Sequence, residues 1–231
     1  MRVILTCEHA VPDIPWQHRN LFENEPGVLS THEAYDPGAW DLFRTLQNLA
    51  DFSKAQVVGR LLVETNRSLR NRKLFSRFSS ALSKVEKENI LKSYYYPYRQ
   101  KIEDEIQKYI ISGHKVLHLS VHSFTPVLNG KKRNCDLGLL YDPNKEEERF
   151  FCRDLKAQIS LINPGLKIRF NYPYLGKADG FTTSLRKLFP SNYLGIEIEV
   201  NQAWVSNNDM NAQLKEVIHD SLKELIKKET V

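Results

Sequence analysis

The chain has 231 residues, of which 41% are hydrophobic and 26% are charged. These fractions are typical of a globular protein, and no apolar run approaches the roughly 20 residues that a membrane-spanning helix needs. The formal net charge of +5 favours anionic ligands. The sequence contains no groove-reading motif and no RNA-binding aromatic strand, so a nucleic acid is a weaker candidate partner than a small anionic substrate.

The cysteines and the N-terminus indicate a cellular compartment. Cys7, Cys135 and Cys152 are odd in number and lack the Cys-x-x-Cys spacing, which favours reduced thiols over disulfides. The N-terminus passes from Met1-Arg2 directly into a strand-like run, which is unlike a signal peptide. We therefore expect a cytoplasmic protein that forms one domain over residues 1–231.

Strand-like and helix-like segments alternate along the first half of the chain. Asp36 and Pro37 favour a helix start, because Asp is preferred at the N-cap and Pro at the first helical position. Pro97 is expected to interrupt a later long helix and Gly113 to end it. In chain order we expect a strand at 2–7, a helix from 36 to about 49, a strand at 55–65, a basic loop or mobile cover at 68–84, and a helix at 85–111.

The second half of the chain continues the alternation. Its apolar runs are short and continuous, which is typical of strands buried in a parallel sheet. In chain order we expect strands at 115–122 and 136–141, a helix at 144–161, strands at 167–172 and 193–200, and a helix at 208–228. This pattern predicts a layered α/β domain.

Two of the expected strands lead into histidines, His9 and His122. Ligands of open α/β sheets bind beyond the carboxyl ends of the strands. Catalytic zinc takes three protein ligands, often imidazole nitrogens, and keeps one position open for water. The pair therefore predicts a hydrolytic zinc site, and the alternative is two ordinary loop histidines bonded to the backbone.

A carboxylate is expected as the third ligand, and two residues compete for this role. Glu8 lies at the end of a buried strand, where a carboxylate must find a partner. Asp36 starts a helix, where it could equally serve as a simple N-cap. The residue pattern alone does not choose between Glu8 and Asp36.

The last expected strand carries Glu197 and Glu199, which share one face because side chains alternate along a strand. Carboxylates in an apolar run are rarely left buried without a partner. One of them is a candidate general base that takes a proton from water, and Glu199 is favoured because it lies nearer the carboxyl end. The alternative is a salt bridge to an arginine.

Asn66-Arg67 follows the strand expected at 55–65. The planar guanidinium of arginine can grip a carboxylate through two hydrogen bonds, so Arg67 is a candidate substrate clamp. A solvated surface arginine is the alternative. Arg133 is a weaker candidate for the same role, and it could also lie near the oxyanion that develops during hydrolysis.

Six motifs follow one another along the chain. They are Glu8-His9, His32-Glu33-Ala34-Tyr35-Asp36-Pro37-Gly38-Ala39, Glu64-Thr65-Asn66-Arg67-Ser68, His122-Ser123-Phe124-Thr125-Pro126, Asn171-Tyr172-Pro173-Tyr174 with Asp179-Gly180, and Glu199-Val200-Asn201-Gln202. In this order they resemble the N-formylglutamate amidohydrolase family, from residue 3 to about residue 204. The better-characterised members carry Pro-His where this chain has Glu8-His9, and Asp-x-Asn-Arg where it has Glu64-Thr65-Asn66-Arg67. The order of the motifs is also similar to that of zinc carboxypeptidases.

The resemblance implies a three-layer α/β/α sandwich with a central mixed, mostly parallel sheet, like that of zinc peptidases, and a bound Zn²⁺. It implies that Glu199 is the general base and that a small N-acyl amino acid is the substrate. The other implied roles are metal ligands at His9, Asp36 and His122, a carboxylate clamp at Asn66 and Arg67, and positions near the substrate at Tyr174 and Asp179.

Three functions remain open from the sequence. The first is zinc-dependent hydrolysis of the amide bond of an N-formyl-glutamate-like substrate, with Glu199 as the base and Arg67 as the clamp. The second is a carboxypeptidase-like or other deacylating metallohydrolase that uses the same residues. The third is a non-enzymatic protein that binds anions or nucleic acid through its basic segment at 60–77.

Overall fold

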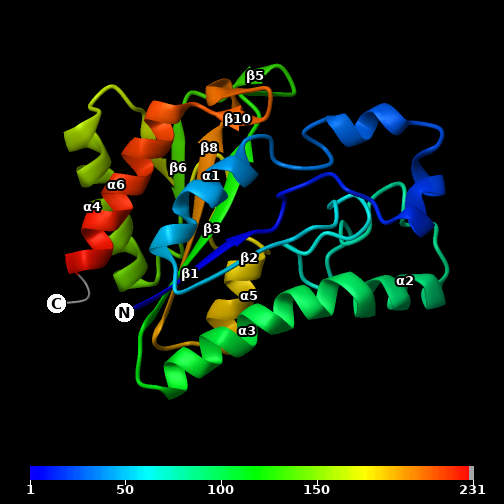
Figure 1. Cartoon of the computed structure of the whole chain (residues 1–231), viewed down its shortest axis with the longest axis horizontal. Coiled ribbons are helices and arrows are strands. Elements are labelled where there is room, and N and C mark those ends of the chain that lie inside the picture. The colour runs from blue at the N-terminus through cyan, green and yellow to red at the C-terminus, as the bar shows by residue number, and fades with distance from the viewer. Residues whose placement is uncertain (229–231) are drawn as a thin grey trace.

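The structure is a computed structural model that describes residues 1–228. Six strands form its central sheet in the order β2-β1-β3-β8-β6-β7. Neighbouring strands run parallel except at the β6–β8 pair, so the sheet is mixed and mostly parallel (Figure 1). The bounds are β1 Arg2–Cys7, β2 Phe52–Ala55, β3 Val116–Phe124, β6 Leu137–Leu140, β7 Ile168–Phe170 and β8 Tyr193–Asn201.

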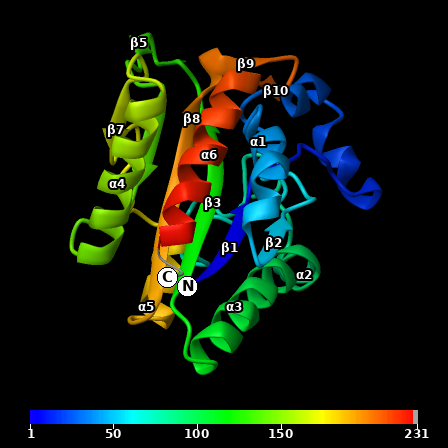
Figure 2. The same cartoon turned by 60° about the vertical axis from the view of Figure 1, so that its left-hand side comes forward.

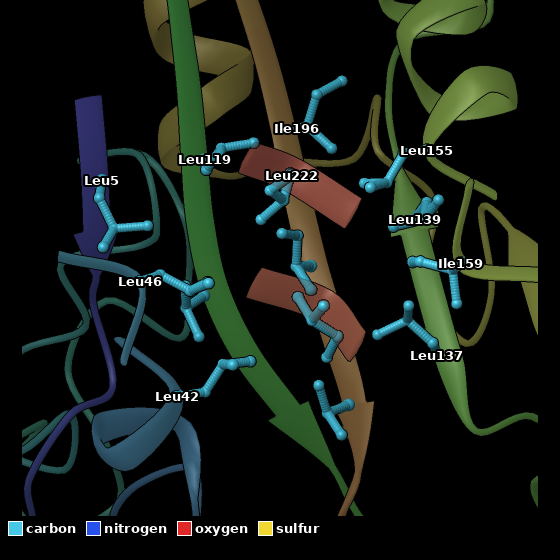
Figure 3. Close-up of a cluster of buried hydrophobic side chains, with 14 of the residues drawn as sticks. Leu5, Leu42, Leu46, Leu119, Leu137, Leu139, Leu155, Ile159, Ile196 and Leu222 are labelled. Carbon is cyan, nitrogen blue, oxygen red and sulfur yellow. The ribbon is translucent and has the colours of Figure 1, made fainter. Parts of the chain in front are cut away.

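Helices cover both faces of this sheet and complete the three-layer α/β/α sandwich that the family resemblance implies. Figure 2 shows α4 (Glu146–Ile162), α6 (Ala212–Lys228) and α1 (Ala39–Leu46) in a row over one face. Leucine and isoleucine side chains of this layer interlock with those of the strands, as Figure 3 shows for Leu46, Leu222 and Leu155. The other face is covered by α3 (Tyr96–Ile111) and α5 (Phe181–Leu188).

A second, smaller hydrophobic cluster lies to one side of the sheet. It joins the irregular segments at 8–35 and 56–83 to α2 (Lys84–Ile90) and includes two 3-10 turns, Trp16–Phe22 and Pro26–Ser30. Ser83 begins α2 with a reciprocal capping box to Glu86. This cluster holds residues 60–67 beside the carboxyl ends of β1 and β3.

The prediction of a strand at 55–65 is wrong. The sheet strand β2 ends at Ala55, and residues 56–65 form turns. Val58, Leu61 and Val63 pack into the smaller cluster and not onto the sheet. A short apolar run fits either arrangement, because burial in any core satisfies it.

One other expectation in the first half of the chain needs correction. The helix expected from Asp36 begins at Ala39, with Gly38 at the N-cap in the left-handed region at φ 78°, so Asp36 does not cap it. Residues 68–83 form the expected loop, and Leu74 and Ser79 within it are buried. It packs as a wall of the second cluster.

The remaining predicted elements are found within a few residues of their expected bounds. The long helix is interrupted just before Pro97, by the π-helical turn Leu91–Tyr95, and Gly113 follows its end at φ 80°. Elements that the sequence analysis did not anticipate are α5 and the hairpins β4 (Val127–Leu128) with β5 (Lys131–Lys132) and β9 (Val205–Ser206) with β10 (Asp209–Met210). Within residues 1–228, no helix is both long and apolar enough to cross a membrane.

Candidate metal and hydrolase site

Three buried side chains converge where β1 and β3 end. The Nδ1 atoms of His9 and His122 lie 3.1 Å apart, and Oδ2 of Asp36 lies 3.1 Å from the first and 2.9 Å from the second. Zinc bonds nitrogen and oxygen at about 2.0–2.2 Å, so tetrahedral ligands stand about 3.3 Å apart. The three donor atoms therefore have the spacing and the chemistry to hold such an ion.

Both imidazoles are held from behind by buried carboxylates. Nε2 of His9 lies 2.6 Å from Oε1 of Glu64, and Nε2 of His122 lies 3.2 Å from Oε2 of Glu8. A carboxylate at Nε2 places the proton there and leaves the Nδ1 lone pair free for a metal. Both histidines thus present the same nitrogen to the same point.

Glu8, the alternative third ligand, takes this supporting position. Its carboxylate also accepts hydrogen bonds from Tyr98 Oη at 2.9 Å and from Ser120 Oγ at 2.5 Å. Asp36 supplies the carboxylate of the cluster instead. The backbone N–H of Asp36 donates to the carbonyl of His9 at 3.0 Å, which ties the two residues together.

The cluster favours a positive charge at its centre. Burial lowers the pKa of His122, but hydrogen bonds with Asp36 and Glu8 outweigh burial and raise that pKa well above 6.5. Burial raises the pKa of Asp36, yet the charge of His9 and the bonds from both histidines lower it overall. A proton or a metal ion is therefore stabilised between these groups, and metal binding would release a proton.

Glu199 lies beside His122, because the two residues are register partners on the parallel strands β3 and β8. Its Oε2 atom is buried and has no hydrogen-bond partner among the described residues. Burial raises the pKa of Glu199 to about 8, and the carboxylates of Asp36 and Glu197 add to the effect against the opposing charge of His122. Glu197 differs, because Thr182 Oγ1 donates to its carboxylate.

A cavity of about 470 Å³ opens above the cluster. The residues predicted as a clamp line it, and Nη1 of Arg67 donates to the backbone carbonyl of Asp179. The Asp179 carboxylate accepts from Asn71 and from the backbone of Ser68, which fixes the loop that carries Arg67. Asn66 is less free, since its Oδ1 accepts the backbone N–H of Phe181 at 2.7 Å.

Tyr174 and Arg133 occupy different positions relative to this cavity. Tyr174 lines it and is 45% exposed. Arg133 is not one of the described residues that line the cavity. Its Cζ lies 5.2 Å from the centroid of the Tyr174 ring. Arg133 also donates to the carbonyl and hydroxyl of Thr125, so it braces the wall behind Tyr174.

Sequence reasoning named no role for Arg60 or Lys73 in the site, and it quoted Glu64 only as part of the Glu64-Thr65-Asn66-Arg67 motif. Arg60 bridges Oδ1 of Asp36 at 3.2 Å and Oε2 of Glu64 at 2.8 Å. Glu64 follows Leu61-Leu62-Val63, so the argument used for Glu199, an acid in an apolar run, could have found it. Lys73 lines the cavity from an irregular segment that gives no periodic signal.

Comparison with known proteins gives a family and a fold. A family model described as N-formylglutamate amidohydrolase matches residues 1–205. Among solved structures, the gene product Atu2144 from Agrobacterium tumefaciens has a TM-score of 0.83 at 25% identity, over 99% of this chain and 92% of that chain. No curated protein matches the sequence.

Two further solved structures are more distant. The N-formylglutamate amidohydrolase from Ralstonia eutropha JMP134 has a TM-score of 0.72 at 14% identity, over 100% of this chain and 95% of that chain. This likeness extends to the fold alone. A putative carboxypeptidase A from Shewanella denitrificans OS-217 reaches a TM-score of 0.39 at 14% identity, over 98% of this chain and 58% of that chain, which is too low to bear on the fold.

Proposed function

Because the chain belongs to the N-formylglutamate amidohydrolase family, we propose that it is a zinc-dependent amidohydrolase acting on a small N-acyl amino acid. The family itself supports hydrolysis of an amide bond. One observation carries the finer proposal: the donor atoms of His9, Asp36 and His122 converge in the cavity that Glu199 also lines.

In this proposal His9, Asp36 and His122 hold the ion. A zinc ion held there would polarise the substrate carbonyl and lower the pKa of a bound water molecule. Glu8 and Glu64 keep both histidines in the form that binds metal, through the contacts at their Nε2 atoms. Arg60 balances part of the negative charge of Asp36 and Glu64.

Glu199 is the proposed general base. It accepts a proton from the attacking water and passes it to the leaving nitrogen, so the amide C–N bond breaks and a carboxylic acid and an amine form. Its unpartnered Oε2 supports this role, because no protein group competes for the proton. Glu197 is less suited, since Thr182 already occupies its carboxylate.

Arg67 is the proposed clamp for the substrate carboxylate. Within residues 1–228, its guanidinium donates one hydrogen bond, to the neutral backbone carbonyl of Asp179, so its remaining N–H groups are available to an anion. Holding the carboxylate fixes the amide over the cluster and makes the reaction effectively unimolecular. Asn66 and Tyr174 line the same cavity and would contact the substrate, and Arg133 would act through Tyr174.

Metal analysis of His122→Ala tests the metal site. We expect near-stoichiometric zinc in the wild type and loss of zinc in this variant, because one of three ligands is gone. His219→Ala is the matched control, since His219 bonds Asn48 and Asp220 at the surface of α6. A wild-type protein purified without chelator that neither contains nor takes up a divalent ion would contradict the proposal.

Kinetics of Arg67→Ala test the clamp. With N-formylglutamate as the probe, we expect a raised KM and a largely retained kcat, the signature of lost uniform binding. Equal turnover of neutral N-acyl compounds by wild type and variant would be consistent with this role. A carboxypeptidase-like activity would appear instead as release of a C-terminal residue from peptides with no cleavage of N-formylglutamate.

A further inference from the structure

The cavity above the metal-ligand cluster has walls of two kinds. Its cations, Arg60, Arg67 and Lys73, all come from the irregular segment at 60–73. Its large apolar side chains come from two other segments: Leu128 from the β4–β5 hairpin, and Tyr174 and Leu175 from the loop after β7. We name Leu128, Tyr174 and Leu175 the apolar wall.

The side chains of the apolar wall are partly exposed to solvent, unlike those of a hydrophobic core. Leu128 is 42% exposed, Tyr174 is 45% exposed and Leu175 is 57% exposed. Single exposed apolar residues are common on any surface, but several that line one cavity indicate a ligand with apolar surface. Binding pockets typically combine such a lining with a few fixed polar groups, which the metal-ligand cluster and Arg67 provide here.

Each part of the apolar wall is held by neighbouring residues. Leu128 stands on a two-residue hairpin whose turn residues, Asn129 and Gly130, have φ of 49° and 74°, values typical of a tight hairpin turn. Arg133 lies behind the Tyr174 ring. Asn171 Oδ1 accepts the N–H of Gly176 at 2.9 Å and so holds the turn that carries Leu175. The wall is thus largely formed before any ligand binds.

A formyl group cannot use this wall, because it contributes a single carbon, and that carbon sits at the reaction centre. In the proposed function, Arg67 holds the carboxylate of the amino-acid part of the substrate. The part of the substrate that then remains free to reach the apolar wall is the acyl substituent beyond the carbonyl. A cavity of about 470 Å³ has room for it.

We propose that the acyl group removed by this enzyme carries an apolar chain or ring that packs on Leu128, Tyr174 and Leu175. The substrate class is then an N-acyl amino acid with an acyl group of several carbons, hydrolysed to a carboxylic acid and a free amino acid. This inference rests on the proposed amidohydrolase function and narrows its substrate.

A chain-length series tests the inference on the zinc-loaded protein. The substrates are the N-formyl, N-acetyl, N-butanoyl and N-hexanoyl derivatives of glutamate. We expect kcat/KM to rise with length, by about two- to fourfold for each added methylene that the wall covers. A highest kcat/KM for the formyl compound overturns the proposal. A second series keeps the formyl group and lengthens the amino-acid side chain, and a rise confined to that series also overturns it.

Variants of the wall make the test specific. Leu128→Ser and Leu175→Ser should each lower the ratio of kcat/KM for N-hexanoyl-glutamate to that for N-formyl-glutamate by about tenfold. Both side chains are exposed enough for the fold to tolerate serine. Val85→Ser is the matched control, because Val85 is 70% exposed on α2 and does not line the cavity. A ratio that stays at the wild-type value in both wall variants contradicts the inference.

A binding measurement separates this inference from the proposed function. Glu199→Gln, loaded with zinc, should bind N-hexanoyl-glutamate more tightly than N-formyl-glutamate in calorimetry, whether or not the wild type turns either over. Chain-dependent binding without wild-type turnover would reject the hydrolase and keep the apolar ligand. Turnover without any dependence on chain length, in rate or in binding, would reject the apolar ligand and keep the hydrolase.

Discussion

At the scale of single residues, Asp36 fits two sequence patterns, a helix N-cap and a candidate metal ligand. Asp before Pro is a strong helix-start signal, yet α1 begins three residues later at Ala39 and receives no cap from Asp36. The carboxylate instead contacts His9 and His122 on one oxygen and Arg60 on the other. Aspartate is a common residue both at helix N-caps and in metal sites, so the sequence does not distinguish the two roles. The tertiary contacts of Asp36 are needed to do so.

Glu199 gives a pH prediction for the chelated protein. Its pKa is about 8 in the fold against an ordinary 4.5, so between these values the folded state keeps a proton that the unfolded state has lost. The free energy of unfolding of the wild type should therefore fall relative to Glu199→Gln as pH rises from 4.5 to 8. The slope should approach about 1.4 kcal/mol per pH unit.

Urea titrations at pH 5, 6, 7 and 8 measure this difference. Glu199→Gln keeps the size of the side chain and removes its ionisation, so titrating groups that do not interact with Glu199 cancel. Zinc-loaded protein provides a second comparison, because a nearby cation lowers the pKa of a carboxyl group and should flatten the slope. Parallel pH profiles for chelated wild type and Glu199→Gln would show that Glu199 ionises normally.

At the scale of elements, continuous apolar runs predicted β1, β3 and β8 well, because these strands are buried on both faces. The same logic failed at 56–65, where the apolar residues fill a second cluster away from the sheet. Helix α5 was missed because its eight residues include Thr182, Thr183 and Ser184, which have modest helix propensity. An apolar run indicates that a segment is buried, but it does not indicate which layer or cluster the segment packs into.

Helix α3 supports the loop that carries Arg67, and Arg99 is the residue that makes this contact. Arg99 is 8% exposed, and its Nη1 donates to the carbonyls of Thr65 at 3.2 Å and Arg67 at 3.3 Å. Tyr95 Oη donates to the Arg67 carbonyl as well, at 2.7 Å. Arg99→Met should loosen the clamp and raise KM for an N-acyl amino acid about tenfold, with kcat largely kept.

Steady-state kinetics check the role of Arg99 in positioning Arg67. Arg99→Lys should recover part of the affinity, because an ammonium can still donate to one of the two carbonyls. Lys101→Ala is the control on the same helix, since Lys101 is exposed, its ion pair is with Glu105 and its Nζ lies over the Phe52 ring, away from the Arg67 loop. A fall in kcat at unchanged KM would mean that Arg99 supports the reaction centre and not the clamp.

At the scale of the whole molecule, the site joins residues that are more than a hundred positions apart. Parallel pairing brings the carboxyl ends of β1, β3 and β8 to one edge. His9, His122 and Glu199 could be predicted as neighbours because each stands at or just beyond the carboxyl end of an expected strand. Arg60, Glu64 and Lys73 could not be placed in this way. They come from turns of the second cluster, whose position depends on packing that no periodic pattern records.

Metal binding should therefore stabilise the whole fold, because its ligands come from separate segments and no such site exists in the unfolded chain. A ligand at a hundred times its Kd stabilises the native state by about 2.7 kcal/mol, which raises Tm by roughly 5–10 °C for a protein of this size. We expect this shift when zinc is added to chelated wild type and to His219→Ala. Calorimetry should show no such shift for His9→Ala or His122→Ala. Equal shifts in all four proteins would place the zinc elsewhere on the surface and remove the physical basis for joining these segments into one metal site.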